Sequence, residues 1–240
     1  MKKLTKSIFK ELKKQKSKDK FLLFLDTPIL VEEAIKNGYS PNFVLLSENS
    51  SFEFLNKYND VCYLASTEEL SFFSDAKTNA GLVAAFNVKN KPFKKINSKF
   101  LVLDGLQDAG NVGTLLRTAL ACDFNSVILV DCVHLSNPKL IRSSAGAIFK
   151  LNILECNFED FLKLKLKNLI YADMNGKDIK DTTFYENFGL VLGNEGNGVS
   201  KKMRNLCEAS VALKMKNDLE SLNVAVAGSI IMYFCTHFKN

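Results

Sequence analysis

Residues 100–117 read FLVLDGLQDAGNVGTLLR, an apolar run followed by a glycine-rich turn and the start of a helical pattern. A similar order returns at 189–200, GLVLGNEGNGVS, and the triplet Ser221-Leu222-Asn223 opens a third apolar run that reaches Phe234. Ligands of open α/β sheets bind beyond the carboxyl ends of the strands. We therefore expect these three segments to converge on one site.

Strands and helices alternate through the second part of the chain, which predicts a mostly parallel sheet covered on both faces. The predicted strands are 100–103, 127–130, 151–154, 169–172, 190–192 and 210–213. The predicted helices are 112–121, 139–144, 158–165, 201–206 and 223–238.

A lysine-rich segment around Pro92 predicts a domain boundary. Residues 88–99 carry five lysines and few apolar residues, a composition that favours an extended connector. The prediction is a first domain at 1–92, a linker at 93–99 and a second domain at 100–240. Within the first domain, strand patterns at 21–25, 43–46, 61–64 and 82–86, with a helical pattern at 29–37, indicate a small α/β fold.

The formal charge of +6 is concentrated at the start of the chain, where the first 20 residues hold nine lysines against Glu11 and Asp19. Such a run steers a protein toward phosphates, or it is the solvated face of a helix. Composition leaves both readings open.

The six cysteines include no C-x-x-C pair and have no histidine nearby, so no zinc site or other metal site is expected. Reduced thiols favour a cytoplasmic protein. The apolar runs are shorter than the roughly 20 residues that cross a bilayer, and 21–25 is too short for a signal sequence. No membrane association is expected.

The glycine spacings argue against common nucleotide folds. Gly105, Gly110 and Gly113 do not form G-x-G-x-x-G, and the turn at 193–198 lacks a P-loop lysine. A nucleotide-dependent oxidoreductase is therefore disfavoured.

The three segments resemble the signature motifs of the SpoU/TrmH-like RNA ribose 2′-O-methyltransferases of the SPOUT superfamily, and the first domain looks like the substrate-binding domain that often precedes them. The resemblance implies a small α/β RNA-binding domain, ribosomal-protein-like, followed by an α/β trefoil-knot domain with a mostly parallel sheet. It also implies a homodimer formed through the knotted domain, and S-adenosylmethionine as methyl donor, leaving S-adenosylhomocysteine, with no metal.

The resemblance assigns residues of the second and third motifs to the cofactor. Glycine at 193 lets the backbone approach a ligand closely, because no Cβ intervenes. Two departures, Ala109 and Lys214 where the family usually has proline, put the geometry of the cofactor loop in doubt. The expected cofactor-binding residues are Leu192, Gly193, Leu213, Met215 and Leu222.

Arg117 matches the arginine of the first motif. A guanidinium resists deprotonation, so stabilising the developing alkoxide and binding phosphate suit it better than acting as a base; the alternative is an exposed helix arginine. Ser221 is also placed like an ordinary N-cap. The expected catalytic residues are Arg117, Asn111, Glu195, Ser221 and Asn223, and the general base is left open.

The stretch 137–146 is similar to a family segment whose arginine faces nucleic acid, so Arg142 and Lys139 are expected RNA contacts. The resemblance implies methylation of ribosomal RNA, commonly the large subunit and a guanosine. The alternatives are a transfer RNA 2′-O-methyltransferase and a non-catalytic RNA-binding or ribosome-assembly protein that kept the knotted fold.

Overall fold

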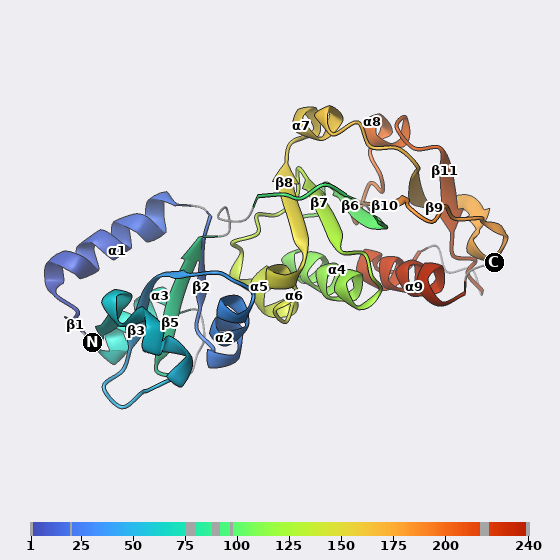
Figure 1. The fold of residues 1–240 in the computed structure, drawn as a ribbon. Coiled ribbons are helices and arrows are strands. Elements are labelled where there is room, and N and C mark those ends of the chain that lie inside the picture. Colours follow the sequence, from blue (N-terminus) through green and yellow to red (C-terminus); the bar gives the residue numbers. More distant parts are fainter. Residues whose placement is uncertain are drawn as a thin grey trace. The chain divides into compact units, whose positions relative to one another are not determined.

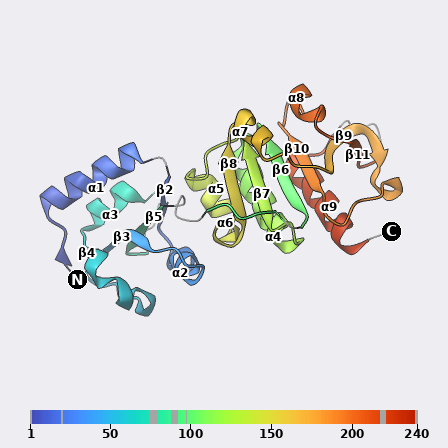
Figure 2. The same ribbon diagram turned by 45° about the horizontal axis from the view of Figure 1, so that its top comes forward.

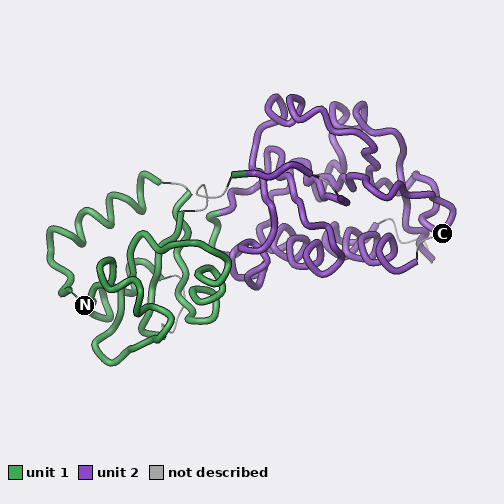
Figure 3. Tube along the Cα trace, in the orientation of Figure 1, with its two compact units in different colours: residues 1–92, 136–138 green, residues 93–135, 139–240 purple. Residues whose placement is uncertain are grey.

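The computed structural model describes residues 2–19, 21–74, 80–87, 92–96, 98–216 and 221–238. The chain divides into two compact units, Met1–Pro92 with Ser136–Pro138, and Phe93–Leu135 with Lys139–Asn240 (Figure 3). Positions 88–91 and 97 of the expected connector lie outside the described residues. Phe93 and Ile96 pack against the core of the second unit.

The first unit is built on a five-stranded sheet in the order β1-β4-β3-β5-β2, in which β5 runs antiparallel to both of its neighbours. Its elements are β1 (Lys2–Lys3), α1 (Lys6–Lys18), β2 (Leu22–Leu25), α2 (Pro28–Lys36), β3 (Pro41–Leu46), η1 (Glu53–Val61), β4 (Cys62–Leu64), α3 (Thr67–Phe73) and β5 (Leu82–Asn87).

The lysine-rich start of the chain is an integral part of this unit. Thr5 caps α1, and Leu4 and Leu12 are buried in the core cluster with Phe43 and Phe73. Lys6, Lys10 and Lys14 are exposed; at a spacing of four residues they share one face of the helix. The segment is thus an amphipathic helix with a free basic stripe.

The second unit contains a six-stranded sheet in the order β11-β9-β10-β6-β7-β8, and all five pairings are parallel (Figure 1). Its elements are β6 (Phe100–Asp104), α4 (Ala109–Ala121), β7 (Ser126–Val130), α5 (Pro138–Ser143), α6 (Ala147–Lys150), β8 (Asn152–Cys156), α7 (Phe158–Lys163), β9 (Leu169–Asp178), η3 (Ile179–Asp181), β10 (Gly189–Gly193), α8 (Lys201–Arg204), β11 (Ala209–Ala212) and α9 (Val224–His237).

Helices cover both faces of this sheet (Figures 1 and 2). On one face, Phe161 of α7 and Met203 of α8 pack against Val102, Ile128 and Val191. On the other, α9 packs on α4 and β10. The expectation of a mostly parallel sheet with two covered faces is confirmed.

The close packing of α9 depends on Gly228. A Cβ at this position would lie 2.3 Å from a methyl group of Leu192 and 2.8 Å from one of Leu115. Only glycine lets the helix approach β10 and α4 this closely. The contact fixes the N-terminal end of α9 beside the carboxyl end of β10.

Strand β9 is longer and less regular than the expected strand at 169–172. Its pairing with β11 steps from Tyr171↔Ser210 directly to Lys177↔Val211, so residues 172–176 bulge out of the ladder. A Cβ on Gly176 would lie 2.8 to 2.9 Å from the β11 backbone. Bulges of this kind redirect side chains beside functional sites.

None of the helices within the described ranges is long and apolar enough to cross a membrane.

Candidate active site

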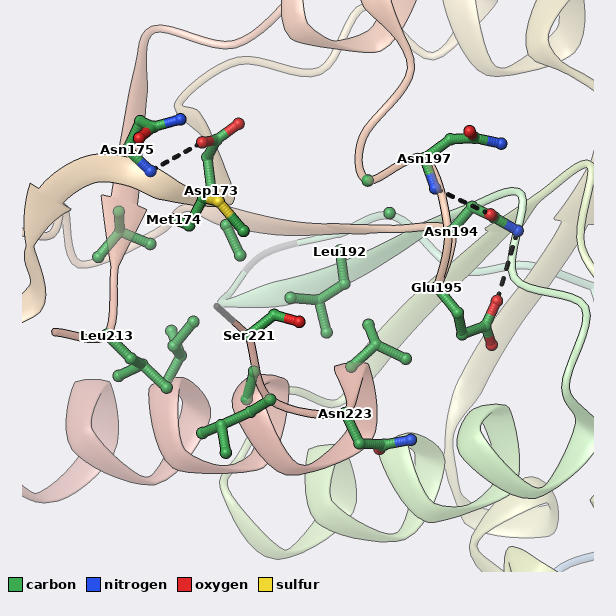
Figure 4. Close-up of a pocket in the computed structure, with 18 of the residues that line it drawn as sticks. Asp173, Met174, Asn175, Leu192, Asn194, Glu195, Asn197, Leu213, Ser221 and Asn223 are labelled. Atoms are coloured by element: carbon green, nitrogen blue, oxygen red, sulfur yellow. Dashed lines mark hydrogen bonds between the residues drawn. The ribbon is translucent and has the colours of Figure 1, made fainter. Parts of the chain in front are cut away.

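A cavity of about 650 Å³ lies where β9, β10 and β11 end and α9 begins (Figure 4). This volume lies within the ordinary range for small-molecule sites. The structure brings eight of the expected residues to its wall, namely Leu192, Gly193, Leu213, Met215 and Leu222 from the expected cofactor set and Glu195, Ser221 and Asn223 from the expected catalytic set.

The middle of the cavity is apolar. Its lining there includes Leu192 at the end of β10, Leu213 after β11, and Ala227 and Ile231 of α9. Leu192 itself is 1 % exposed. A flat aromatic group such as a purine can bury its faces against such side chains, because burial of apolar surface is favourable.

The loop after β10 is held closed by Asn194. Its backbone exchanges two hydrogen bonds with Gly198, and its side-chain oxygen accepts the N–H groups of Gly196 and Asn197. A Cβ at Gly193 would lie 2.1 Å from the backbone of Gly198 and Val199. The turn can therefore fold back this closely onto the end of the strand only because residue 193 has no Cβ.

A chain of side-chain hydrogen bonds joins the three motifs. The Nδ2 of Asn223 donates to the Oδ1 of Asn111 at 3.1 Å, and the Nδ2 of Asn111 donates to the Oε1 of Glu195 at 3.1 Å. The other Glu195 oxygen accepts from Asn194 at 3.4 Å. Asn111 does not line the cavity, but it orients two residues that do.

Asn223, and not Ser221, is the N-cap of α9. Its Oδ1 accepts the N–H groups of Ala225 and Val226 at 2.9 and 3.3 Å. The capping role that the sequence allowed for Ser221 is therefore wrong. Ser221 is exposed at the cavity wall.

Asn111 is placed by the N-terminus of α4. The Oδ1 of Asp108, the N-cap, accepts the Asn111 N–H at 2.9 Å. The ammonium of Lys139 pairs with the other Asp108 oxygen at 2.7 Å. Hydrogen bonds from Lys139 and from the Asn111 backbone hold the pKa of Asp108 below its usual value. Lys139 thus supports the helix that carries Asn111.

The structure does not bring Arg117 to this cavity. Arg117 is exposed on α4 and lines a different, mainly apolar groove of about 700 Å³ with Ile230, Tyr233 and Phe238 of the C-terminal segment. In a helix, six residues from Asn111 to Arg117 correspond to a turn of roughly 240°, so the two side chains leave different faces. Arg142 is exposed as well, and its side chain makes no hydrogen bond or ion pair to the residues described.

Among the lining residues that were not predicted from the sequence are Asp173, Met174 and Asn175 of the β9 bulge, and Arg204 of α8. Gly176 inside a strand pattern was the available signal, because glycine there often marks a bulge. Within the described ranges, no group of three or more His, Cys, Asp or Glu side chains is placed to hold a metal ion.

Comparisons with known proteins agree with this geometry. Residues 98–233 match the SpoU rRNA Methylase family. The 23S rRNA (guanosine(2553)-2′-O)-methyltransferase RlmP of Bacillus subtilis is 30% identical over 233 residues, which cover 94% of this chain and 93% of the relative.

Two solved structures share the fold. The AdoMet-bound rRNA methyltransferase from Sinorhizobium meliloti superposes with a TM-score of 0.83 at 20% identity, covering 97% of this chain and 95% of that one. The SpoU methyltransferase AviRb from Streptomyces viridochromogenes, in complex with AdoMet, gives a TM-score of 0.79 at 20% identity, covering 94% and 92%.

The fold, with a cavity beyond the carboxyl ends of its parallel strands, defines an α/β protein with a ligand site in the position usual for such sheets. The family match and the similarity to the Bacillus subtilis enzyme then identify the family: the chain belongs to the SpoU rRNA methylase family. It is an RNA methyltransferase that uses S-adenosylmethionine.

Proposed function

We propose that this enzyme methylates the 2′-hydroxyl of a guanosine in large-subunit ribosomal RNA. The support for this substrate is the similarity to the Bacillus subtilis enzyme over nearly the full length of both chains. The observation that carries the reaction is the hydrogen-bond chain from Asn223 through Asn111 to Glu195, which joins all three motifs at the cavity.

The proposed reaction is a substitution at the methyl carbon of S-adenosylmethionine. A bond forms between the ribose oxygen and the methyl carbon, the bond from that carbon to sulfur breaks, and the hydroxyl proton leaves. The cofactor supplies a methyl already activated by its cationic sulfur. The tasks left to the protein are alignment and stabilisation of the developing alkoxide.

The roles proposed for the residues follow from their positions. The apolar wall with Leu192, Leu213 and Leu222 holds the adenosine, with Gly193 and Met215 beside it. Asn111, Glu195 and Asn223 shape the edge where the ribose enters, with Ser221 at the same wall. The proton acceptor is not assigned to any of them.

A homodimer places Arg117 at the site. The α9 surface beside Arg117 carries exposed apolar side chains: Val226 is 48 %, Ile230 45 % and Tyr233 53 % exposed. We propose that a second copy of the chain covers this face, since two-fold dimers bury the same patch of both subunits. Arg117 of one subunit then reaches the ribose and phosphate bound at the cavity of the other.

The basic stripe of α1 is the proposed phosphate-binding surface of the first unit. The side chains of Lys6, Lys10 and Lys14 are exposed and make no hydrogen bond or ion pair to the described residues. Exposed lysines bind RNA through its phosphates and release counterions. Arg142 is a second proposed contact. A cytoplasmic location follows from the ribosomal substrate, and the six free cysteines are compatible with it.

The test is methyl transfer from tritiated S-adenosylmethionine to ribosomal RNA taken from cells that lack the gene. We expect label in the large-subunit RNA, at one nucleotide that primer extension locates in the wild-type strain and not in the deletion strain. Label in transfer RNA alone would overturn the proposed substrate. Binding of S-adenosylhomocysteine without transfer to any cellular RNA would favour the non-catalytic alternative.

A further inference from the structure

The cofactor cavity has a second polar region, formed by residues outside the three motifs. Besides Glu195, its only ionisable lining side chains among the described residues are Asp173 and Arg204. Figure 4 shows Asp173 and Asn175 on the opposite side of Leu192 from Glu195 and Asn223. The apolar middle of the cavity thus lies between two polar regions.

Asp173 reaches the cavity because β9 bulges. The five residues from Ala172 to Gly176 have no partners on β11, and four of them, Ala172 to Asn175, line the cavity. Gly176 then returns the chain to the ladder by packing directly on the β11 backbone. An unbulged strand would continue its pairing here instead of opening into the site.

The Asp173 carboxylate is held in place from both sides. Its Oδ1 accepts the N–H of Asn175 at 2.9 Å, and its Oδ2 lies 3.2 Å from Nη1 of Arg204. The side chain of Asp173 is only 13% exposed. Each carboxylate oxygen can accept two hydrogen bonds, so one position on each oxygen remains for a ligand.

Arg204 connects the bulge to the loop of the second motif. Its Nε donates to the carbonyl oxygen of Val199 at 2.8 Å, and its guanidinium lies 5.5 Å from the ring centre of Tyr171. The pair Asp173–Arg204 therefore joins β9 to the end of the loop that begins at Gly193. Arg204 is a positioning residue for the carboxylate.

We propose that Asp173 binds the ribose hydroxyls of the adenosyl group, with Arg204 fixing the carboxylate. This inference rests on the proposed use of the cavity for S-adenosylmethionine. Two neighbouring hydroxyls are neutral donors, and a carboxylate already paired with a guanidinium suits neutral donors better than a second cation such as the methionyl ammonium. Acidic side chains bind the ribose hydroxyls of other nucleoside cofactors in the same manner.

The test compares ligands that differ in the ribose or in the amino-acid part. Calorimetry measures binding of S-adenosylhomocysteine, its 3′-deoxy and 2′-deoxy analogues, and 5′-methylthioadenosine, which keeps the ribose and lacks the amino acid. Loss of a hydrogen bond to a charged group should weaken binding to wild-type protein by at least about tenfold for one or both deoxy analogues. Wild-type protein that binds all three ribose forms equally would overturn the proposal.

Asp173→Ala should abolish this preference, so that the intact and deoxy ligands bind with nearly equal affinity. The same variant should bind methylthioadenosine and S-adenosylhomocysteine more weakly than wild-type protein does, by similar factors. If methylthioadenosine is unaffected while S-adenosylhomocysteine weakens, the carboxylate faces the methionyl group and the proposal is wrong. Asp160→Ala, which removes an exposed carboxylate paired with Lys163 in the same unit, is the matched control and should keep the wild-type preference.

Arg204→Met keeps the carboxylate and removes its anchor. This variant should bind all of these ligands more weakly, by similar factors, and should keep part of the preference for intact ribose. Complete retention of wild-type affinity would contradict the positioning role. If the cavity did not take S-adenosylmethionine at all, the result would look different, because wild-type protein would then bind none of the ligands.

Discussion

Asn111 and Asn223 lie 112 positions apart in sequence, and their side chains share a hydrogen bond of 3.1 Å. Asn111 belongs to the first turn of α4 and Asn223 caps α9. The bond therefore joins the N-terminal ends of two packed helices at the edge of the cavity. Because Asn111 also donates to Glu195, loss of Asn223 affects both a helix end and the orientation of the Asn111 and Glu195 side chains.

Replacement of Asn223 by alanine should lower both stability and turnover. Loss of an N-cap costs about 1 kcal/mol, and Asn111 loses the partner that orients it. Thermal unfolding and tritiated-methyl transfer measure the two effects. Asn157→Ala removes an N-cap asparagine from α7 and should lower stability alone; equal loss of turnover in both variants would mean that Asn223 acts through stability only.

Gly193→Ala should abolish cofactor binding. The added Cβ would lie 2.1 Å from the Gly198–Val199 backbone, so the loop has to move away from the strand. Gly196→Ala is the matched control, since its nearest neighbour would be the Asn194 side-chain oxygen at 3.6 Å. Calorimetry with S-adenosylhomocysteine should show binding only for the control, and normal affinity of Gly193→Ala would refute the close-approach argument.

Arg117→Ala should nearly abolish methyl transfer and leave the affinity for S-adenosylhomocysteine within a few fold, because Arg117 lies outside the cavity. Mixing Arg117→Ala with Gly193→Ala tests the proposed dimer. Half of the dimers are then mixed, and each mixed dimer holds one complete site, so roughly a quarter of the wild-type rate should return. If the mixed dimers form and no methyl transfer returns, Arg117 acts at the site of its own subunit and the proposed arrangement is wrong.

The basic stripe of α1 should contribute to RNA affinity through salt-dependent contacts. Replacing Lys6, Lys10 and Lys14 with glutamine should reduce the slope of log affinity against log salt by about 2 to 3. Substitution keeps Leu4 and Leu12 in the core, whereas deletion of residues 1–20 would remove them. Lys36, Lys163 and Lys202, each paired with a carboxylate, form the control triple; an unchanged slope for the stripe variant would identify it as a solvated helix face.

Two partly buried thiols should make the protein less stable at high pH. Burial raises the pKa of Cys132 and of Cys207 to about 12. The unfolded thiols ionise near pH 8.5 to 9, so the stabilisation is complete below that pH and is lost as pH rises toward 12. In urea titrations under reducing conditions, the free energy of unfolding should fall between pH 9 and 11, by less than about 1.4 kcal/mol per pH unit for each thiol because both are only partly buried. Cys132→Ala should have a shallower slope, and a slope equal to that of the wild type would contradict the assignment.

Much of the sheet was predictable, because its strands are continuous apolar runs bounded by turns, as in the segment before Asp104. The meeting of the three motif loops was predictable as well, because the carboxyl ends of parallel strands lie at one edge of a sheet. The bulge of β9 was not, because the place of Asp173 and Asn175 depends on how β9 pairs with β11, a strand about 35 residues further along the chain. Their place in the cavity, and that of Arg204, emerges only in three dimensions.

The face of α4 that carries Arg117 illustrates a different limit. A helix assignment fixes the angle between Asn111 and Arg117 but not which side of the helix faces the cavity.

Two helices of the first unit could have been predicted from the sequence. Ser66 and Glu69 form a capping box at α3, and Leu4, Ile8 and Leu12 recur at the four-residue spacing of a helix.

The insertion of β10 between β9 and β6 has a consequence for synthesis on the ribosome. A nascent chain that ends before residue 189 already contains β6 and β9, but the strand that joins them has not been made. Both strands then present unpaired edges, which are prone to associate with other chains. A pause in translation after β9 is made and before β10 is made would therefore prolong the time in which the nascent chain can aggregate.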